Sequence, residues 1–199
     1  MPVKHFISKF DALPAAGEEW LGGDNRAMLA HIIAELPAGA NVLEMGSWLG
    51  RSACFMLEVN PNIKLCCMDT WKDTRPPEER GGTDNDTLFD QFIANMYKLG
   101  LLGKISVVRE DTQNVLKYLK QGSFDAIYID ASHEEEDVYR DFHNAYKLLK
   151  VGGHLMGDDW NWNSVSKGVM RAFWEINQDK ELLWPIRAGV TSYNTHKLP

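Results

Sequence analysis

Acidic residues stand at the ends of four apolar runs that have the length and composition of buried strands. They are Glu44, Asp69, Asp130 and the adjacent pair Asp158 and Asp159. Because the carboxyl ends of parallel strands line one edge of a sheet, we expect these carboxylates to converge on one crevice. An acid after a single strand is often only a helix cap, but capping alone does not readily account for acids at four strand ends. The spacing therefore predicts a ligand site.

Three of these acids, Asp130, Asp158 and Asp159, follow two strands that we expect to be neighbours in the sheet. Carboxylate oxygens suit Mg²⁺ or Ca²⁺, whereas the absence of Cys and of several His disfavours zinc. Carboxylates at close range also raise one another's pKa, which a bound cation would offset. The trio predicts a divalent-metal site. In the alternative, one of Asp158 and Asp159 caps the following turn and no metal binds.

One histidine lies close in sequence to this acidic group. His133 stands three residues after Asp130, at a predicted helix start. A neutral imidazole is a suitable general base near pH 7, and a neighbouring metal ion would lower the pKa of an acceptor hydroxyl. His133 is therefore the candidate catalytic base; in the alternative it makes only structural contacts. His154 lies inside a predicted strand and is expected to be a packed residue.

Residues 41–52 predict a strand, a glycine turn and a helix. The apolar run contains Glu44 near its end, Gly46 and Gly50 follow, and the helix begins at Ser52, a candidate cap. The turn lacks the G-x-G-x-x-G pattern of dinucleotide sites and the Gly-Lys-Ser or Gly-Lys-Thr of phosphate loops. Glu44 would repel phosphate and suits a cationic ligand. In the alternative, this is a tight turn with no ligand.

The pattern Glu-x-Gly-Ser-x-x-Gly-Arg-Ser at residues 44–52 resembles motif I of class I S-adenosylmethionine (AdoMet)-dependent methyltransferases. Asp-Thr-Trp at residues 69–71 and the acids after the fourth and fifth predicted strands are similar to metal-dependent O-methyltransferases of the macrocin and cephalosporin-tailoring type. The resemblance covers roughly residues 41–160. It implies a three-layer Rossmann-like α/β fold, AdoMet as cofactor, and O-methylation of a small hydroxylated acceptor, assisted by Mg²⁺ or another divalent cation such as Ca²⁺.

The resemblance also implies roles for the matching residues. Glu44 would lie near the amino end of the methionine moiety, Asp69 on the ribose hydroxyls, and Asp111 near the adenine amino group. Asp111 is also a candidate N-cap, and both roles can hold together. The three acids after the fourth and fifth strands would be the metal ligands, with His133 as base. The implied cofactor-binding residues are Glu44, Gly46, Ser47, Trp48, Asp69, Thr70, Trp71, Asp111, Thr112 and Asp130.

Four tryptophans, Trp48, Trp71, Trp160 and Trp162, follow directly after predicted strands. Packing in the core is the usual explanation for any one of them. Their clustering at the ligand edge favours flat apolar walls for adenine, a sugar face or an aromatic acceptor, and does not choose among these.

Composition limits the number of domains, the partners and the compartment that we expect. The chain has 199 residues, 44% hydrophobic and 25% charged, with a net charge of −7. One soluble domain is expected, with no duplex nucleic acid as partner and no membrane span. Cys54, Cys66 and Cys67 cannot all pair within the chain, and we expect buried thiols in a reducing, cytoplasmic compartment. A homo-oligomer is possible.

Strands alternate with helices along the chain, which predicts a mostly parallel sheet covered on both faces. A helix capped by Ser132 is expected to end at Gly152, and residues 72–86 are either a lid or a surface loop. A closing hairpin, 182–187 with 190–194, would add an antiparallel last strand. The arm and first helix occupy residues 1–40 and the AdoMet-binding core residues 41–199. The predicted strands are 41–45, 63–69, 105–108, 124–130 and 153–157; further helices are 24–36, 52–58, 87–99, 113–120 and 165–176.

Two other functions are consistent with this organisation. A nicotinamide-dependent oxidoreductase would share the Rossmann-like architecture, although the missing G-x-G-x-x-G and the presence of Glu44 count against it. A non-catalytic protein with the AdoMet-binding fold is the other alternative, which the acids at the metal positions disfavour.

Overall fold

The computed structural model describes residues 8–13, 21–73, 84–178, 187–188 and 192–197. Within them, one seven-stranded sheet has the order β3-β2-β1-β4-β5-β7-β6. β1 to β5 run parallel, and β7 is antiparallel to both β5 and β6. The strands are β1 (Asn41–Met45), β2 (Lys64–Asp69), β3 (Ile105–Arg109), β4 (Phe124–Ile129), β5 (Leu149–Gly157), β6 (Arg187–Ala188) and β7 (Tyr193–His196).

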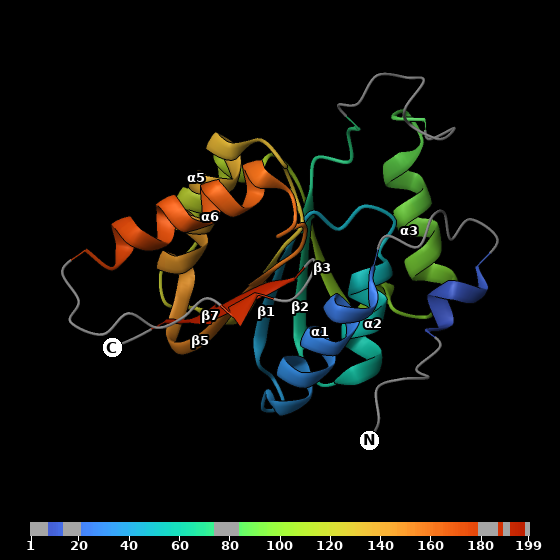
Figure 1. Ribbon diagram of the computed structural model, residues 1–199. Coiled ribbons are helices and arrows are strands. Elements are labelled where there is room, and N and C mark those ends of the chain that lie inside the picture. The colour runs from blue at the N-terminus through green and yellow to red at the C-terminus, as the bar shows by residue number, and fades with distance from the viewer. Residues whose placement is uncertain (1–7, 14–20, 74–83, 179–186, 189–191, 198–199) are drawn as a thin grey trace.

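Helices cover both faces of the sheet (Figure 1). α1, α2 and α3 pack on one face, and α5 and α6 pack on the other. This arrangement confirms the predicted three-layer α/β fold with an antiparallel C-terminal strand. The helices are α1 (Gly23–Glu35), α2 (Arg51–Val59), α3 (Leu88–Lys98), α4 (Thr112–Val115), α5 (Glu135–Leu148) and α6 (Asn163–Ile176), with 3-10 turns η2 (Lys9–Ala12), η4 (Leu102–Lys104) and η5 (Leu116–Tyr118).

Successive side chains of β1 point to opposite faces of the sheet, as strand geometry requires. Val42 lies in the apolar core under α1, α2 and α3, whereas Leu43 and Met45 lie in the core under α5 and α6. Glu44 shares the face of Val42 and is fully buried. Burying a carboxylate is costly unless hydrogen bonds compensate it, so the surroundings of Glu44 bear directly on the site.

The predicted cap of α2 is wrong. The helix begins at Arg51, and its N-cap residue is Gly50 rather than Ser52. The hydroxyl of Ser52 donates to Oε1 of Glu44 at 2.6 Å. Ser52 faces the buried carboxyl group of Glu44 on β1, which needs hydrogen bonds to compensate its burial.

The predicted cap of α5, Ser132, is also wrong. α5 begins at Glu135 after the N-cap residue Glu134, which makes no side-chain cap. The hydroxyl of Ser132 accepts the N–H of Glu134 at 3.3 Å and donates to Oδ2 of Asp137 at 3.0 Å. At its other end the helix runs directly into β5, which begins at Leu149 and not at the predicted residue 153.

Two predictions fall partly outside the described residues. Of the insertion 72–86, residues 74–83 are not described; at its base Asp73 and Asn85 exchange hydrogen bonds of 2.7 and 2.9 Å, so its ends meet. The lid stays a prediction. Of the closing hairpin, β6 and β7 confirm the antiparallel pairing. Among the described helices, none combines the length and apolar character needed to cross a bilayer.

Gly46, directly after β1, is packed against the end of β4. Its φ is +89°, and a Cβ built on it would lie 1.8 Å from the carbonyl oxygen of Asp130. Its N–H donates to the carbonyl of Met68 at 2.8 Å, and Asp130 donates to Met45 at 2.8 Å. The turn after β1 is therefore wedged between β2 and β4, and only glycine fits there.

We predict that Gly46→Ala abolishes folding or lowers the free energy of unfolding by more than about 3 kcal/mol, because backbone must move to admit the methyl group. Gly39→Ala is the matched control. Gly39 also has a positive φ, +80°, but no described atom lies within 4 Å of its Cβ position. The control should lose only about 1–2 kcal/mol from the left-handed backbone. Urea unfolding followed by circular dichroism measures both; equal losses would contradict the packing argument.

Candidate active site at the carboxyl edge of the sheet

The structure brings the acids at the ends of β4 and β5 together. Ile129 stands opposite Gly157 in the sheet, so Asp130 and Asp158 follow paired positions. Burial raises the pKa of Asp130 well above its usual range, and repulsion from Asp158 and Asp159 raises it further. Carboxylates arranged in this way favour a bound cation, which relieves their mutual repulsion.

His133 lies against this acidic group. Its Nε2 stands 2.7 Å from Oδ2 of Asp159, and its ring packs against Trp162 at a tilt of 38°, with 4.8 Å between centroids. Ligand atoms of Asp130, His133 and Asp159 all lie within 4.8 Å of one another. Nε2 is buried, yet among the described residues no acceptor is aligned with it for a hydrogen bond, despite the short distance to Asp159. The structure thus groups His133, rather than Asp158, with the other two acids.

Asp158 is directed to structural partners instead. Its side chain is nearly buried, with 7% exposed, and Oδ1 accepts the N–H of Asp159 at 2.6 Å. A further hydrogen bond joins it to the side chain of Asn25 on α1. Burial raises the pKa of Asp158 to about 6. The alternative in which one acid of the pair holds the following turn therefore describes Asp158, and its role as a metal ligand stays a prediction.

A strained turn aims the side chain of Asp159 at His133. Asp159 has a φ of +57°, a left-handed conformation that is uncommon for residues other than glycine. The carbonyl of Asp159 accepts the N–H of Trp162 at 2.8 Å, which closes the turn before α6. Strain of this kind persists where surrounding contacts over-determine it, and it is concentrated at functional sites.

Glu44 lies directly beneath the glycine turn. Its Oε1 accepts the hydroxyl of Ser52, and its Oε2 accepts the hydroxyl of Ser47 in a short hydrogen bond. Burial raises the pKa of Glu44 to about 7, against the opposing effect of the two serine hydroxyls. The glutamate is therefore poised between its charged and neutral forms near neutral pH.

Asp69, at the end of β2, holds the same turn from the other side. Its Oδ2 accepts the N–H of Trp48 at 2.8 Å, and its Oδ1 accepts the N–H of Trp71 at 2.7 Å. Both tryptophans have positive φ, 45° and 49°, and Nε1 of Trp71 donates to the carbonyl of Trp48 at 2.7 Å. Burial raises the pKa of Asp69, and these backbone donors lower it. The adjacent Thr70 accepts the N–H of Lys72.

The tryptophans are not all exposed at the carboxyl edge of the sheet. The prediction of a flat wall is wrong for the indole of Trp71, which is fully buried and packs on Phe89 and Phe92 at 4.9 and 4.7 Å. Trp160 is half-buried against Tyr193. Trp162, with 50% of its surface exposed, is the one that stands open beside the candidate base.

Asp111 and Thr112 sit on a turn that is tied to α5. Oδ1 of Asp111 accepts the N–H of Gln113 at 2.8 Å, which confirms it as the N-cap of α4. The hydroxyl of Thr112 donates to Oδ1 of Asp141 at 2.7 Å, and Nε2 of Gln113 donates to the same oxygen at 2.6 Å. Burial raises the pKa of Asp141 to about 7.

The sequence interpretation missed Asp141. Its only signal is an acid beside Phe142, between Val138 and Ala145, where the buried stripe of α5 requires apolar residues.

Comparison with known protein families agrees with this geometry. A family model described as a methyltransferase domain matches residues 43–160, more than half of the chain. The chain belongs to this methyltransferase family. Family membership contradicts the nicotinamide-dependent oxidoreductase and identifies the protein as an enzyme rather than a binding module. No curated protein matches the chain in sequence.

Solved structures share the fold at low identity. The O-methyltransferase TomG from Streptomyces achromogenes, involved in tomaymycin synthesis and solved with SAM, is 14% identical with a TM-score of 0.64, over 88% of this chain and 81% of that one. An O-methyltransferase from Bacillus cereus, in complex with SAH, is 16% identical with a TM-score of 0.63, over 88% and 82%. A SAM-dependent O-methyltransferase from Thermotoga maritima is 14% identical with a TM-score of 0.63, over 92% and 68%.

We predict that Glu44→Gln stabilises the protein at pH 8. A pKa of about 7 in the folded protein, against 4.5 ordinarily, means that stability from this group is complete below about pH 4.5 and is lost as pH rises through 7. The amide avoids the ionised, desolvated form, and the serine hydroxyls can rotate to meet it. We expect a gain of about 1–3 kcal/mol at pH 8, vanishing near pH 4. Urea unfolding across this pH range is the measurement; a difference independent of pH would contradict it.

Proposed function

We propose that the protein is an AdoMet-dependent O-methyltransferase that acts on a hydroxyl group of a small acceptor, with a divalent metal ion assisting. The observation that carries this proposal is the juxtaposition of His133 with Asp159 and Asp130 at the end of β4, beside a glycine turn held by buried carboxylates. Such a crevice joins a cationic cofactor site to a general base. The cytoplasmic location and assembly into homo-oligomers stay predictions.

The cofactor would lie over Gly46 and along the ends of the first three strands. Sulfonium and ammonium are both cations, and Glu44 and Asp69 place carboxyl groups at the turn where these would sit. Asp111 stands at the next strand end and would approach the adenine amino group. The related folds solved with SAM or SAH support this choice of cofactor. The remaining proposed contacts are Ser47, Trp48, Thr70, Trp71 through its backbone, Thr112 and Asp130.

The residues present fit a divalent metal ion. Two half-buried carboxylates and the imidazole of His133 offer ligand atoms within one cluster, and Nε2 of His133 is a buried atom without an aligned hydrogen bond. Carboxylates suit Mg²⁺, Ca²⁺ or Mn²⁺, while an imidazole ligand is more typical of transition-metal sites. Asp130 and Asp159 would hold the ion, with Asp158 as the predicted third ligand. When bound, the ion would lower the pKa of an acceptor hydroxyl.

The chain's own residues supply the proton transfer. As a base, His133 would carry its own proton on Nε2, beside Oδ2 of Asp159, and would accept the substrate proton at Nδ1. This role excludes metal binding through Nε2, so base and ligand are alternative roles for His133. The ring takes the proton of the acceptor hydroxyl, and Asp159 stabilises the imidazolium. The acceptor oxygen bonds to the methyl carbon as the carbon–sulfur bond breaks, leaving neutral S-adenosylhomocysteine. Proximity of the two substrates supplies much of the acceleration.

Trp162 suggests the shape of the acceptor. Its indole is half exposed and packs at a tilt against His133, so an acceptor whose hydroxyl reaches the base would lie along the indole. Aromatic rings and the apolar face of a sugar both pack well on such a surface. The proposed acceptor is therefore a small hydroxylated molecule with one flat, apolar face.

We predict that Asp111→Asn weakens S-adenosylhomocysteine binding by about tenfold without changing stability. Asparagine caps helices as well as aspartate does, so the N-cap of α4 survives. Its amide would present a donor to the adenine amino group in place of a carboxylate. Calorimetry gives the dissociation constant and urea unfolding gives the stability. An unchanged dissociation constant would leave Asp111 as a helix cap only. Asp69 is a poorer probe because it also holds two backbone N–H groups.

We also predict that metal removal and loss of His133 affect turnover differently from cofactor binding. Methyl transfer from labelled AdoMet to a panel of hydroxylated acceptors should cease in EDTA, while S-adenosylhomocysteine affinity stays within about twofold. His133→Ala should lower kcat by about 10²–10⁴-fold, the usual range for a general base. Titration of the wild type and His133→Ala with Mn²⁺ tests whether His133 acts as general base or as metal ligand.

If His133→Ala loses turnover but binds Mn²⁺ with normal affinity, the role of His133 as general base is supported. A variant that loses the metal would instead make His133 a ligand. Full turnover after verified metal removal would contradict metal assistance.

A further inference from the structure

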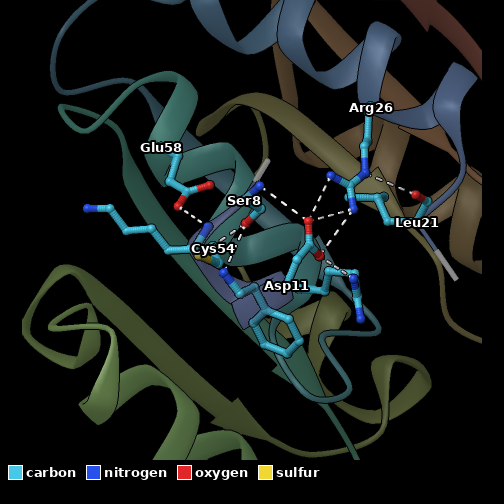
Figure 2. Close-up of polar contacts among 9 residues, drawn as sticks. Ser8, Asp11, Leu21, Arg26, Cys54 and Glu58 are labelled. Carbon is cyan, nitrogen blue, oxygen red and sulfur yellow. Dashed lines mark hydrogen bonds and ion pairs between the residues drawn. The ribbon is translucent and has the colours of Figure 1, made fainter. Parts of the chain in front are cut away.

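Residues 8–13, far in sequence from the crevice, dock on α2 and face α1 (Figure 2). Ser8 caps the 3-10 turn η2: its hydroxyl accepts the N–H of Phe10 at 3.2 Å, and its N–H donates to Asp11 at 3.2 Å. Phe10 is fully buried, and the N–H of Lys9 donates to Glu58 of α2 at 2.8 Å. Residues 8–13 are therefore an integral part of the fold, packed on the outer side of α2.

Asp11 lies between two arginines from different helices. Its carboxylate meets Nη1 and Nη2 of Arg26, on α1, at 3.2 and 3.3 Å, and it meets Nη1 of Arg51, on α2, at short range. The three side chains are mostly buried, at 19%, 17% and 11% exposed. The guanidinium of Arg51 also lies 5.1 Å from the ring centre of Phe10. The carboxylate of Asp11 thus pairs with two mostly buried cations, and removing it there costs more than removing an ion pair at the surface.

Both arginines stand next to residues of the crevice. Arg51 is the first residue of α2 and directly follows Gly50, whose N–H closes the turn onto Ser47 at 2.7 Å. A positive charge at a helix N-terminus is unfavourable, and Asp11 offsets it. Arg26 directly follows Asn25, whose side chain hydrogen-bonds Asp158. Asp11 therefore connects the cofactor turn to the helix that contacts the end of β5.

Other residues of the turn after β1 also hydrogen-bond to side chains from neighbouring elements. The N–H of Trp48 is held by Asp69, and the carbonyl of Leu49 accepts Nδ2 of Asn95 at 3.1 Å. Arg51 directly follows the turn, and its carboxylate partner Asp11 comes from the N-terminal segment. The geometry of the turn at this end depends on the N-terminal segment.

We propose that Asp11 is a positioning residue for the cofactor: it holds the glycine turn and α1 at the separation that the bound cofactor requires. The inference rests on the proposed cofactor site over Gly46. Asp11 itself touches no reacting atom. Without its charge, Asp11 no longer offsets the repulsion between Arg26 and Arg51, and we expect the ends of α1 and α2 beside the cofactor turn to move apart.

The test is calorimetric binding of S-adenosylhomocysteine, with stability measured in parallel. Asp11→Asn should raise the dissociation constant about tenfold, equivalent to about 1.4 kcal/mol, with a stoichiometry still near one. Asp11→Glu restores the charge and should stay within about threefold of the wild type. Arg51→Lys, which keeps the charge but loses the planar fork, should weaken binding in the same direction as Asp11→Asn.

Glu58→Ala is the matched control. It removes the other carboxylate that anchors residues 8–13, at the far end of α2 from the turn. It should lower Tm and leave the dissociation constant within about twofold.

Lower Tm or stoichiometry with an unchanged dissociation constant in Asp11→Asn would make Asp11 merely structural and overturn the proposal. If Asp11→Asn does not fold, an unchanged dissociation constant in Arg51→Lys overturns it equally. Failure of the wild-type protein to bind would overturn the proposed cofactor, and with it this inference.

Discussion

The turn between β1 and α2 depends on hydrogen bonds to two carboxylates that lie largely out of water. Asp69 accepts a backbone N–H from Trp48, and Glu44 accepts the hydroxyl of Ser47. Gly46 is wedged against β4, and two residues later Trp48 also has a positive φ, which is unfavourable for a residue other than glycine. The carboxylates compensate this strain, and the turn is shaped before any ligand arrives.

The same carboxylates leave an excess of acidic groups at the carboxyl edge of the sheet. Burial raises the pKa values of Glu44, Asp69 and Asp130, and the acids at the ends of β4 and β5 repel one another. A cationic cofactor and a divalent ion would each relieve part of this cost. The buried acids therefore lower the stability of the fold without ligand and would raise its affinity for cationic ligands. This is the usual relation between stability and function at an active site.

Three of the described segments around the site are each fixed by a polar side chain from a neighbouring element. Asn95 of α3 holds the carbonyl of Leu49, Asp141 of α5 holds the turn that carries Thr112, and Asp11 holds Arg51. These connections cross from one layer or segment to another, so they are invisible in any local pattern. They explain how loops, the mobile parts of most folds, can present groups with the accuracy that catalysis needs.

The sequence by itself determined the alternation of strands and helices, the antiparallel last strand and the set of acids at one edge, because apolar periodicity and strand-end positions are local properties. It did not determine which partners those acids have. Only the tertiary structure decided that Ser52 serves Glu44 rather than its own helix, that Trp71 belongs to the core, and that His133 rather than Asp158 joins Asp130 and Asp159. The physical reason is that buried polar groups choose partners by distance across the packed layers, which sequence spacing does not encode.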